Sequence, residues 1–203
     1  SGQVLSKKST ISLLALGDSY TIGESVAEVQ RWPVQLVNEL NNRGFSCRPP
    51  EIIAVTGWRT DDLKNAVRDK LPRKDFDLVS LLIGVNNQYQ GKSTEVYAQE
   101  FAELLETAIL HAGGDEAKVF VMSIPDWGYT PFGKDKQEEV SKQIDAFNGI
   151  NRGITTRRGV TYIDITDISR QGLNDPELIA SDGLHPSGKM YRLWVDRILK
   201  NLK

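Results

Sequence analysis

The sequence predicts a single α/β domain of three layers, in which a mainly parallel sheet of five strands has helices on both faces. Short apolar runs alternate along the chain with segments whose apolar residues recur at helical spacing. The apolar runs show no regular polar alternation, which is typical of strands buried on both faces of a parallel sheet. The sequence contains no internal repeat and no linker long enough to separate two domains.

Five apolar runs are the predicted strands. Each is four to six residues long, and glycine, proline or polar residues follow it within two positions. They span residues 11–16, 52–55, 78–83, 119–124 and 160–165.

Helices are predicted between these strands. Pro33 suits the first position of a helix that ends at Gly44, and Leu36, Val37 and Leu40 form its apolar stripe. The next helix spans 60–70, with Thr60 as its expected N-cap and two aspartates in its first turn.

Three longer helices follow. Ser93 precedes a helix whose apolar residues lie at 97, 101, 104, 105 and 108, and which ends at Gly113 and Gly114. Helices over 135–156 and 187–199 complete the pattern. In the last helix, the residues expected to face the core are Met190, Leu193, Trp194 and Ile198.

Composition narrows the function classes. The 203 residues are 39% hydrophobic and 26% charged, with a net charge of −2, which is typical of a soluble globular protein and gives no basic face for nucleic acid. No apolar run approaches the 18 residues of a membrane span. Cys47 is the only cysteine, which excludes an internal disulfide and a cysteine-rich zinc site. We expect its thiol to have no catalytic role, because no histidine is nearby in the sequence.

The first ten residues are polar and lack the apolar core of a signal peptide. We expect residues 1–10 to be an extension or linker ahead of one domain over 11–203. A cytoplasmic chain and an exported chain without its signal both fit this pattern, and the sequence does not indicate an oligomeric state.

The first predicted strand ends abruptly at Gly17, Asp18 and Ser19. In a parallel sheet, ligands bind beyond the carboxyl ends of the strands, so a serine here is either part of a turn or a nucleophile. A serine nucleophile needs a neighbouring base. The chain has two histidines. The helix dipole explains His111 near a helix C-terminus, whereas His185 follows Asp182 by three residues, a spacing that lets the acid orient the imidazole.

Acyl transfer also requires hydrogen-bond donors for an oxyanion. Three candidates follow strand ends, namely the backbone N–H groups of Ser19 and Gly57 and the side-chain amide of Asn86. Each motif alone is common in turns and polar loops. These motifs indicate a particular function only in combination and in this order along the chain.

Over nearly its whole length, from "LLALGDSYTIG" to "DGLHPSGKMY", the chain resembles the SGNH hydrolases, the GDSL-type lipases and esterases. The resemblance implies that Ser19 is the nucleophile, that Gly57 and Asn86 complete the oxyanion hole, and that Asp182 and His185 complete the triad. It also implies a flavodoxin-like sandwich. The segment "IPDWGYTPFG", residues 124–133, is similar to the family's loop after the fourth strand.

One position departs from the family's pattern. The usual third block is G-x-N-D, whereas this chain has Asn87 after Asn86. Asn87 keeps the shape of the acid and lacks its charge, so we expect a changed polar network around Asn86.

The resulting hypothesis is a serine esterase that hydrolyses short-chain acyl or acetyl esters of small molecules through an acyl-enzyme, without metal or cofactor. A noncatalytic carbohydrate- or ligand-binding module is the alternative, because aromatic residues including Tyr129 follow the strand ends. A P-loop is disfavoured because six residues separate Gly84 and Gly91, where that motif has four. The α/β-hydrolase elbow fails because Thr21 stands in place of its second glycine. The predicted substrate pocket comprises Asp18, Tyr20, Trp58, Asn87, Tyr89 and Trp127.

Overall fold

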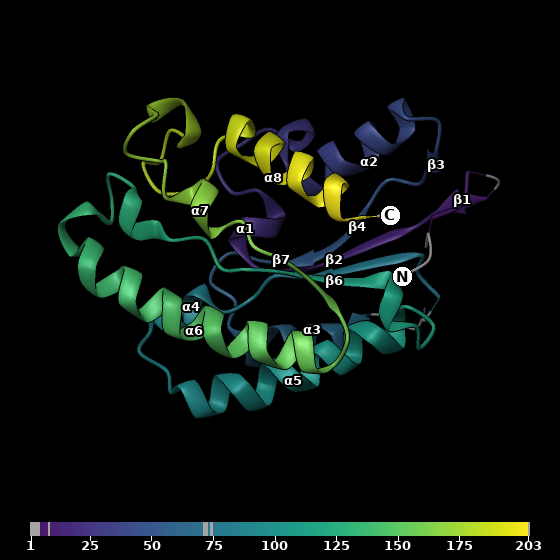
Figure 1. Ribbon diagram of the computed structural model, residues 1–203, viewed down its shortest axis with the longest axis horizontal. Helices are drawn as coiled ribbons and strands as arrows, with labels where there is room; N and C mark the ends of the chain where they lie inside the picture. Colours follow the sequence, from purple (N-terminus) through teal and green to yellow (C-terminus); the bar gives the residue numbers. More distant parts are fainter. Residues whose placement is uncertain (1–4, 8, 71–72, 74, 203) are drawn as a thin grey trace.

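The computed structural model describes residues 5–7, 9–70, 73 and 75–202, in which five parallel strands form one sheet. The strand order is β4-β2-β5-β6-β7, which is 2-1-3-4-5 in chain order, the flavodoxin-like arrangement (Figure 1). The predicted fold class is therefore confirmed. The strands are β2 (Leu13–Gly17), β4 (Glu51–Ala54), β5 (Leu78–Leu81), β6 (Val119–Met122) and β7 (Thr161–Ile163).

Helices cover both faces of this sheet (Figure 1). One face carries α1 (Ser19–Ile22), α2 (Trp32–Asn42), α7 (Thr166–Ser169) and α8 (Gly188–Asn201). The other face carries α3 (Thr60–Lys70), α4 (Val85–Tyr89), α5 (Thr94–His111) and α6 (Gln137–Arg157). Single 3-10 turns lie at Glu28–Gln30, Glu116–Lys118, Trp127–Tyr129, Lys134–Lys136 and Pro176–Leu178.

The core lies on both sides of the sheet. All residues of β2, β5 and β6 are buried, as expected for strands covered on two faces. Trp32 of α2 packs edge-on against Phe120 of β6, with ring centroids 6.3 Å apart. The predicted apolar residues of the long helix α5 are also buried. None of the helices described has both the length and the apolarity needed to cross a bilayer.

The first predicted strand is divided in two. Residues Thr10–Ile11 form β1, which pairs with β3 (Ser46–Cys47) in a separate two-stranded sheet. Ser12 interrupts the run because its N–H and hydroxyl both donate to Asp77 Oδ2, at 2.9 and 3.1 Å. In β3, burial raises the pKa of the Cys47 thiol, which disfavours a reactive thiolate.

Three further details differ from the sequence prediction. Thr60 is the first residue of α3 rather than its cap, and its hydroxyl donates to Glu100. Leu193 does not face the core: it is 40% exposed, whereas Tyr191 and Val195 are buried in its place. The short helices α1, α4 and α7 were not predicted, because four or five residues show no periodicity. Of the predicted extension 1–10, residues 1–4 and 8 lie outside the described residues.

Two aliphatic residues on α8 test this packing. Ile198 is fully buried, so Ile198→Ala should lower the free energy of unfolding by about 2–5 kcal/mol, through lost burial and the cavity left behind. Leu193→Ala, on the exposed side of the same helix, should cost less than about 1 kcal/mol. Urea unfolding of both variants measures the difference. Equal losses would contradict the observed orientation of α8.

Candidate active site

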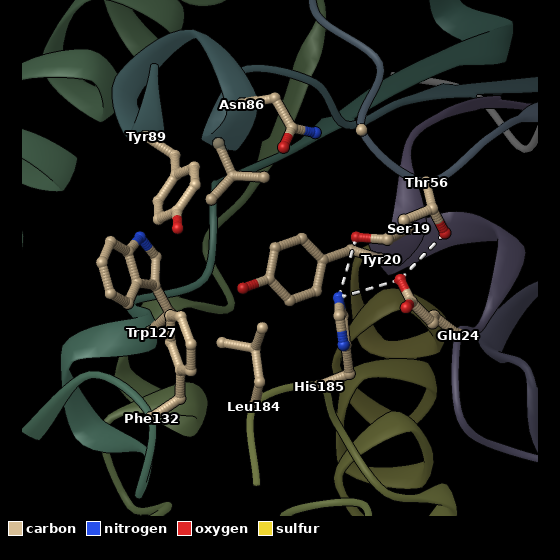
Figure 2. Close-up of a pocket in the computed structure, with 12 residues that line it drawn as sticks. Ser19, Tyr20, Glu24, Thr56, Asn86, Tyr89, Trp127, Phe132, Leu184 and His185 are labelled. Carbon is tan, nitrogen blue, oxygen red and sulfur yellow. Dashed lines mark hydrogen bonds and ion pairs between the residues drawn. The ribbon is translucent and has the colours of Figure 1, made fainter. Parts of the chain in front are cut away.

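Five parts of the chain meet beside the point where the strand order reverses. Four of them follow the carboxyl ends of β2, β4, β5 and β6, and the fifth is the loop before α8. They enclose an open cavity of about 260 Å³ (Figure 2). Ser19, Gly57, Asn86 and His185 all line it. The sheet therefore brings together residues that are far apart in the sequence.

Ser19 is held by a tight turn from β2 into α1. A Cβ atom on Gly17 would lie 2.8 Å from the backbone oxygen of Leu82, so this position accepts only glycine without rearrangement. Asp18 then caps α1, because its Oδ1 accepts the Tyr20 N–H at 3.0 Å. Ser19 is the first residue of that helix and is 5% exposed.

Ser19, His185 and Asp182 form a continuous hydrogen-bonded array. His185 Nε2 lies 3.0 Å from Ser19 Oγ, and His185 Nδ1 lies 2.6 Å from Asp182 Oδ2. The loop itself fixes the acid, since Asp182 Oδ1 accepts the N–H groups of Leu184 and His185, both at 2.9 Å. This is the spacing that general-base activation of a serine requires.

Asp182 is held in its charged form. Partial burial by itself raises the pKa of this carboxyl group, but hydrogen bonds outweigh it and lower the pKa to about 2. The donors are the backbone and ring of His185, the Leu184 N–H and the Ser25 hydroxyl, which lies 2.8 Å from Oδ2. An ionised carboxylate at this distance is able to stabilise a protonated His185 ring.

Asp18 is in the opposite situation. It is fully buried beneath Ser19, and its Oδ2 has no hydrogen-bond partner among the described residues. Desolvation raises its pKa to about 7, although the hydrogen bond from the Tyr20 N–H acts in the other direction. Asp18 supports the turn at Ser19 from below and, contrary to the prediction, does not line the cavity.

The residues of the candidate oxyanion hole also line the cavity. Gly57 adopts a φ of +88°, a conformation that side chains disfavour, while the space beside it is open. Asn86, on α4, donates one amide hydrogen to the Trp58 carbonyl at 2.9 Å. An amide nitrogen carries two hydrogens, so that bond orients Asn86 and leaves a second donor.

Asn87 points away from the cavity and ties α4 to α3. Its Oδ1 accepts the Thr60 N–H at 3.1 Å, and its Nδ2 donates to Thr60 Oγ1 at 2.8 Å. The hydroxyl of Thr60 gives its own hydrogen to Glu100 at 2.8 Å. That hydroxyl has only one hydrogen, so in its hydrogen bond with residue 87 the hydroxyl oxygen must be the acceptor. The side-chain amide of asparagine can donate this hydrogen bond, whereas an ionised carboxylate cannot. The hydrogen bond from Thr60 to Glu100 thus explains why position 87 is asparagine and not the family's usual aspartate.

Aromatic rings form the wall opposite Ser19 and His185 (Figure 2). Trp127 contacts Tyr89 and Phe132, with ring centroids 5.5 and 5.8 Å away. Trp127 is also fixed by donating its indole N–H to Gln88 at 2.8 Å. Tyr20 lines the cavity as well. The Trp58 ring does not: it packs against the core, beneath the Lys70 amine. Tyr129 also lies outside the lining.

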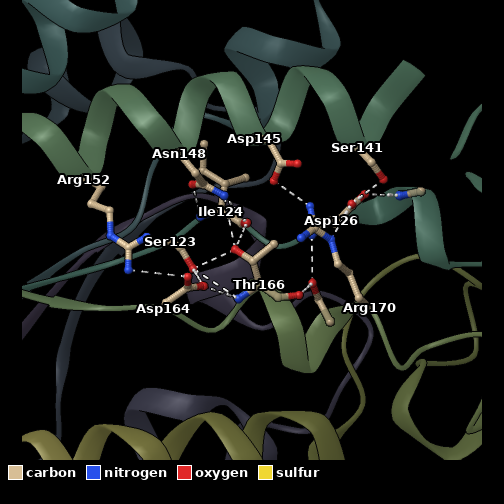
Figure 3. Close-up of polar contacts among 12 residues, drawn as sticks. Ser123, Ile124, Asp126, Ser141, Asp145, Asn148, Arg152, Asp164, Thr166 and Arg170 are labelled. Carbon is tan, nitrogen blue, oxygen red and sulfur yellow. Dashed lines mark hydrogen bonds and ion pairs between the residues drawn. The ribbon is translucent and has the colours of Figure 1, made fainter. Parts of the chain in front are cut away.

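A buried polar network holds the loop that carries Trp127 (Figure 3). Asp126 accepts hydrogen bonds from the Gly128 N–H, from the Ser141 hydroxyl at 2.6 Å and from Arg170 Nε at 3.0 Å. Its own N–H donates to Ser169 Oγ at 2.9 Å. Because Asp126 is buried and its charge is paired with Arg170, the start of this loop is anchored to α6 and α7.

His111 lies outside this site. It is 4% exposed at the end of α5, where its Nδ1 lies 2.5 Å from the carbonyl oxygen of Arg73. The ring thus has a structural partner, and only His185 is placed beside Ser19.

Five lining residues have no signal in the sequence: Glu24, Thr56, Val85, Phe132 and Leu184. Glu24 is the most unexpected, because its Oε2 lies 3.4 Å from His185 Nε2. Glu24, Asp182 and His185 each place one possible metal-ligand atom within 4.8 Å of the others. The Asp182 and His185 atoms already belong to the array with Ser19.

Residues 15–193 match the GDSL-like Lipase/Acylhydrolase family. Solved structures share the fold at low identity. An acetylxylan esterase from Geobacillus stearothermophilus has a TM-score of 0.74 and 19% identity, covering 95% of this chain and 94% of its own. A lipase/acylhydrolase from Enterococcus faecalis has a TM-score of 0.71 and 22% identity, covering 94% of both chains. An acetyl xylan esterase, AlAXEase, has a TM-score of 0.76 and 17% identity, covering 95% of this chain and all 100% of its own. No match was found among curated protein sequences.

The buried Asp18 predicts a pH dependence of stability. Between its unfolded pKa of 3.8 and its folded pKa of about 7, the native state holds a proton that the unfolded state has lost. Stability from this group is therefore full below pH 3.8 and falls as the pH rises through 7, by up to about 4 kcal/mol. Asp18→Asn should remove this loss, so the variant should gain stability relative to wild type between pH 4 and pH 8.

Urea unfolding at both pH values measures that change. Asp69→Asn, on the exposed surface of α3, is the matched control and should follow wild type. A stability difference between Asp18→Asn and wild type that is independent of pH would contradict this account of Asp18.

Proposed function

The chain belongs to the GDSL-like lipase/acylhydrolase family, and on that premise we propose that it is a serine esterase for short-chain acyl esters of small alcohols. The family makes it a GDSL-type hydrolase with small-molecule ester substrates. The finer proposal concerns the catalytic residues and the acyl group, within one catalytic domain over residues 11–203.

The proposed reaction begins at Ser19. Its Oγ attacks the ester carbonyl carbon while His185 Nε2 takes the hydroxyl proton, and Asp182 stabilises the resulting imidazolium. The tetrahedral intermediate then collapses: the bond to the alcohol oxygen breaks, and His185 returns the proton to that oxygen. Water attacks the acyl-enzyme by the same route, releasing the acid and restoring Ser19.

The oxyanion would be bound by the Ser19 and Gly57 N–H groups and by the second amide hydrogen of Asn86. Such donors act most strongly where they are already oriented before the charge develops. The hydrogen bond from Asn86 to the Trp58 carbonyl supports this role, because it fixes the amide plane.

The single observation that carries the proposal is the Ser19–His185–Asp182 array at 3.0 and 2.6 Å in the wall of the cavity. A binding module on this fold would need the aromatic wall and would have no use for that array. The enzyme is therefore favoured over the noncatalytic alternative.

Cavity size supports a short acyl group. A volume of about 260 Å³ lies below the roughly 300–1,000 Å³ of sites that enclose drug-sized ligands. Each methylene buried in an apolar site contributes about 0.8 kcal/mol, and each one left in water contributes nothing. The rings of Tyr89, Trp127 and Phe132 can cover a few carbons, and a longer chain would extend into solvent.

Ser19 should be the residue that reacts with active-site reagents. A fluorophosphonate should add once per chain, and peptide mass spectrometry should locate the adduct at Ser19. Ser19→Ala should abolish both the labelling and the hydrolysis of p-nitrophenyl acetate. His185→Ala should lower kcat by about 10³-fold or more, because the base for a weak nucleophile is gone.

His111→Ala is the matched control for the base. It should retain kcat and lose stability, since it leaves the Arg73 carbonyl without its ring partner. Labelling at another residue, or a loss of kcat in His111→Ala as large as in His185→Ala, would overturn the mechanism.

Acyl-chain preference tests the cavity. For p-nitrophenyl esters from two to sixteen carbons, kcat/KM should be highest between acetyl and butyryl and should fall beyond about eight carbons, where further methylenes find no wall. Measurements below the aggregation limit of each ester give the profile. A maximum at twelve carbons or more would contradict a short acyl site.

A further inference from the structure

Glu24 is a charged residue in the cavity wall that the triad chemistry does not require. Its Oε2 lies 3.4 Å from His185 Nε2 and accepts a hydrogen bond from Thr56 Oγ1 at 2.8 Å (Figure 2). Its side chain is 35% exposed. Among the described residues that line the cavity, none is a lysine or an arginine. The carboxylate therefore lies beside His185 and forms no ion pair with a lysine or arginine of the part of the chain that the structure describes.

The backbone holds Glu24 in this place. Helix α1 ends at Gly23 in a left-handed conformation, and the Glu24 N–H donates to the Ser19 carbonyl at 3.2 Å. Ser25 is also left-handed, with φ +68°, the only positive value among the described residues other than glycine. Its hydroxyl is anchored on Asp182. A strained residue fixed by the triad acid indicates a turn shaped for the site.

The position of Glu24 corresponds to the alcohol side of a bound ester. In the proposed mechanism, His185 Nε2 gives its proton to the alcohol oxygen, so that oxygen must lie within hydrogen-bond distance of Nε2. Glu24 is beside the same nitrogen, and Thr56 is beside Glu24. The aromatic wall of Tyr89, Trp127 and Phe132 is across the cavity, where it can contact the acyl group (Figure 2).

A carboxylate can only accept hydrogen bonds, and Thr56 occupies one of its several acceptor positions. When the alcohol part of the ester is a diol, the free hydroxyl on the carbon next to the esterified carbon is a hydrogen-bond donor beside Glu24. We infer that Glu24 is a specificity-determining residue that accepts a hydrogen bond from this hydroxyl, so the enzyme selects monoesters of vicinal diols and polyols over esters of plain alcohols. This inference rests on the proposed esterase function and adds the alcohol part of the substrate to it.

Two acetates that differ by one methyl group test the inference. 2-Hydroxyethyl acetate offers the hydroxyl, and 2-methoxyethyl acetate masks it on the same carbon skeleton. The wild-type enzyme should prefer the hydroxy ester by about tenfold in kcat/KM, the range expected for a hydrogen bond to a partly solvated carboxylate.

Two substitutions at Glu24 separate the effect of the hydrogen bond from the effect of side-chain size. Glu24→Ala should reduce the ratio of kcat/KM between the hydroxy and the methoxy ester to about one. Glu24→Gln keeps the size and a weaker, neutral acceptor, so about threefold should remain, since charge-assisted hydrogen bonds are roughly twice as strong as neutral ones. The control Glu28→Gln removes one negative charge from an exposed position close to Glu24 in the sequence. It should leave the ratio of kcat/KM between the two esters as in wild type.

Three results would overturn the inference. One is a wild-type ratio near one while p-nitrophenyl acetate is still hydrolysed through Ser19, which would leave the esterase proposal standing. Another is a Glu24→Ala ratio equal to that of wild type, which would mean that Glu24 does not recognise the hydroxyl group. The third is a preference for acetylcholine over 3,3-dimethylbutyl acetate that disappears in both variants, with the hydroxyl ratio unchanged, because Glu24 would then recognise a cation. Failure of the esterase proposal itself would be distinct: no ester would be hydrolysed through Ser19.

Discussion

The close approach of β2 to the end of β5 at Gly17 is the constraint on which the site depends. Only a residue without a Cβ fits beside the Leu82 carbonyl, and the chain enters α1 two residues later. The Ser19 hydroxyl and N–H are thereby fixed relative to the sheet. Every other functional group is then positioned against that reference: Asn86 by α4, Gly57 by the loop after β4, and His185 by the loop before α8. The parallel sheet performs this alignment because its strands all end on one side.

Around that turn, two carboxylates have opposite roles because their surroundings differ. Asp182 receives four hydrogen bonds and stays ionised, with a pKa of about 2, whereas Asp18 is sealed under the serine with one oxygen unpartnered and a pKa of about 7. In the proposed mechanism, the first stabilises a positive imidazolium. The second holds its proton up to a pH of about 7, so the turn at Ser19 avoids a buried negative charge at lower pH.

The sequence was sufficient to predict the fold and to select Ser19, Asp182 and His185, which meet in one hydrogen-bonded array, but it did not predict the whole lining of the cavity. Buried strands and long helices have clear periodicity, and Ser19, Asp182 and His185 follow from the few residue types that can activate a serine. The direction of single side chains was harder. Trp58 and Asn87 follow the predicted strand ends, but neither residue lines the cavity. The Trp58 ring packs on the core. Asn87 forms hydrogen bonds with Thr60, because Thr60 and its partner Glu100 come from other elements that the local sequence does not reveal. Leu193 has the spacing of a core residue and lies on the outer side of α8. Glu24 gave no signal, since its place depends on a left-handed turn with no periodic pattern.

The aromatic wall has an evolutionary consequence. Its centre, Trp127, is held by Gln88 and by a loop anchored on buried Asp126, but its outer members, Tyr89 and Phe132, are 59% and 57% exposed. Substitutions at exposed positions usually change stability little. The depth of the cavity can therefore change through two surface residues while the array of Ser19, His185 and Asp182 and the sheet remain unchanged. Under the proposed function, substitutions at these two positions can change the acyl preference at little cost in stability.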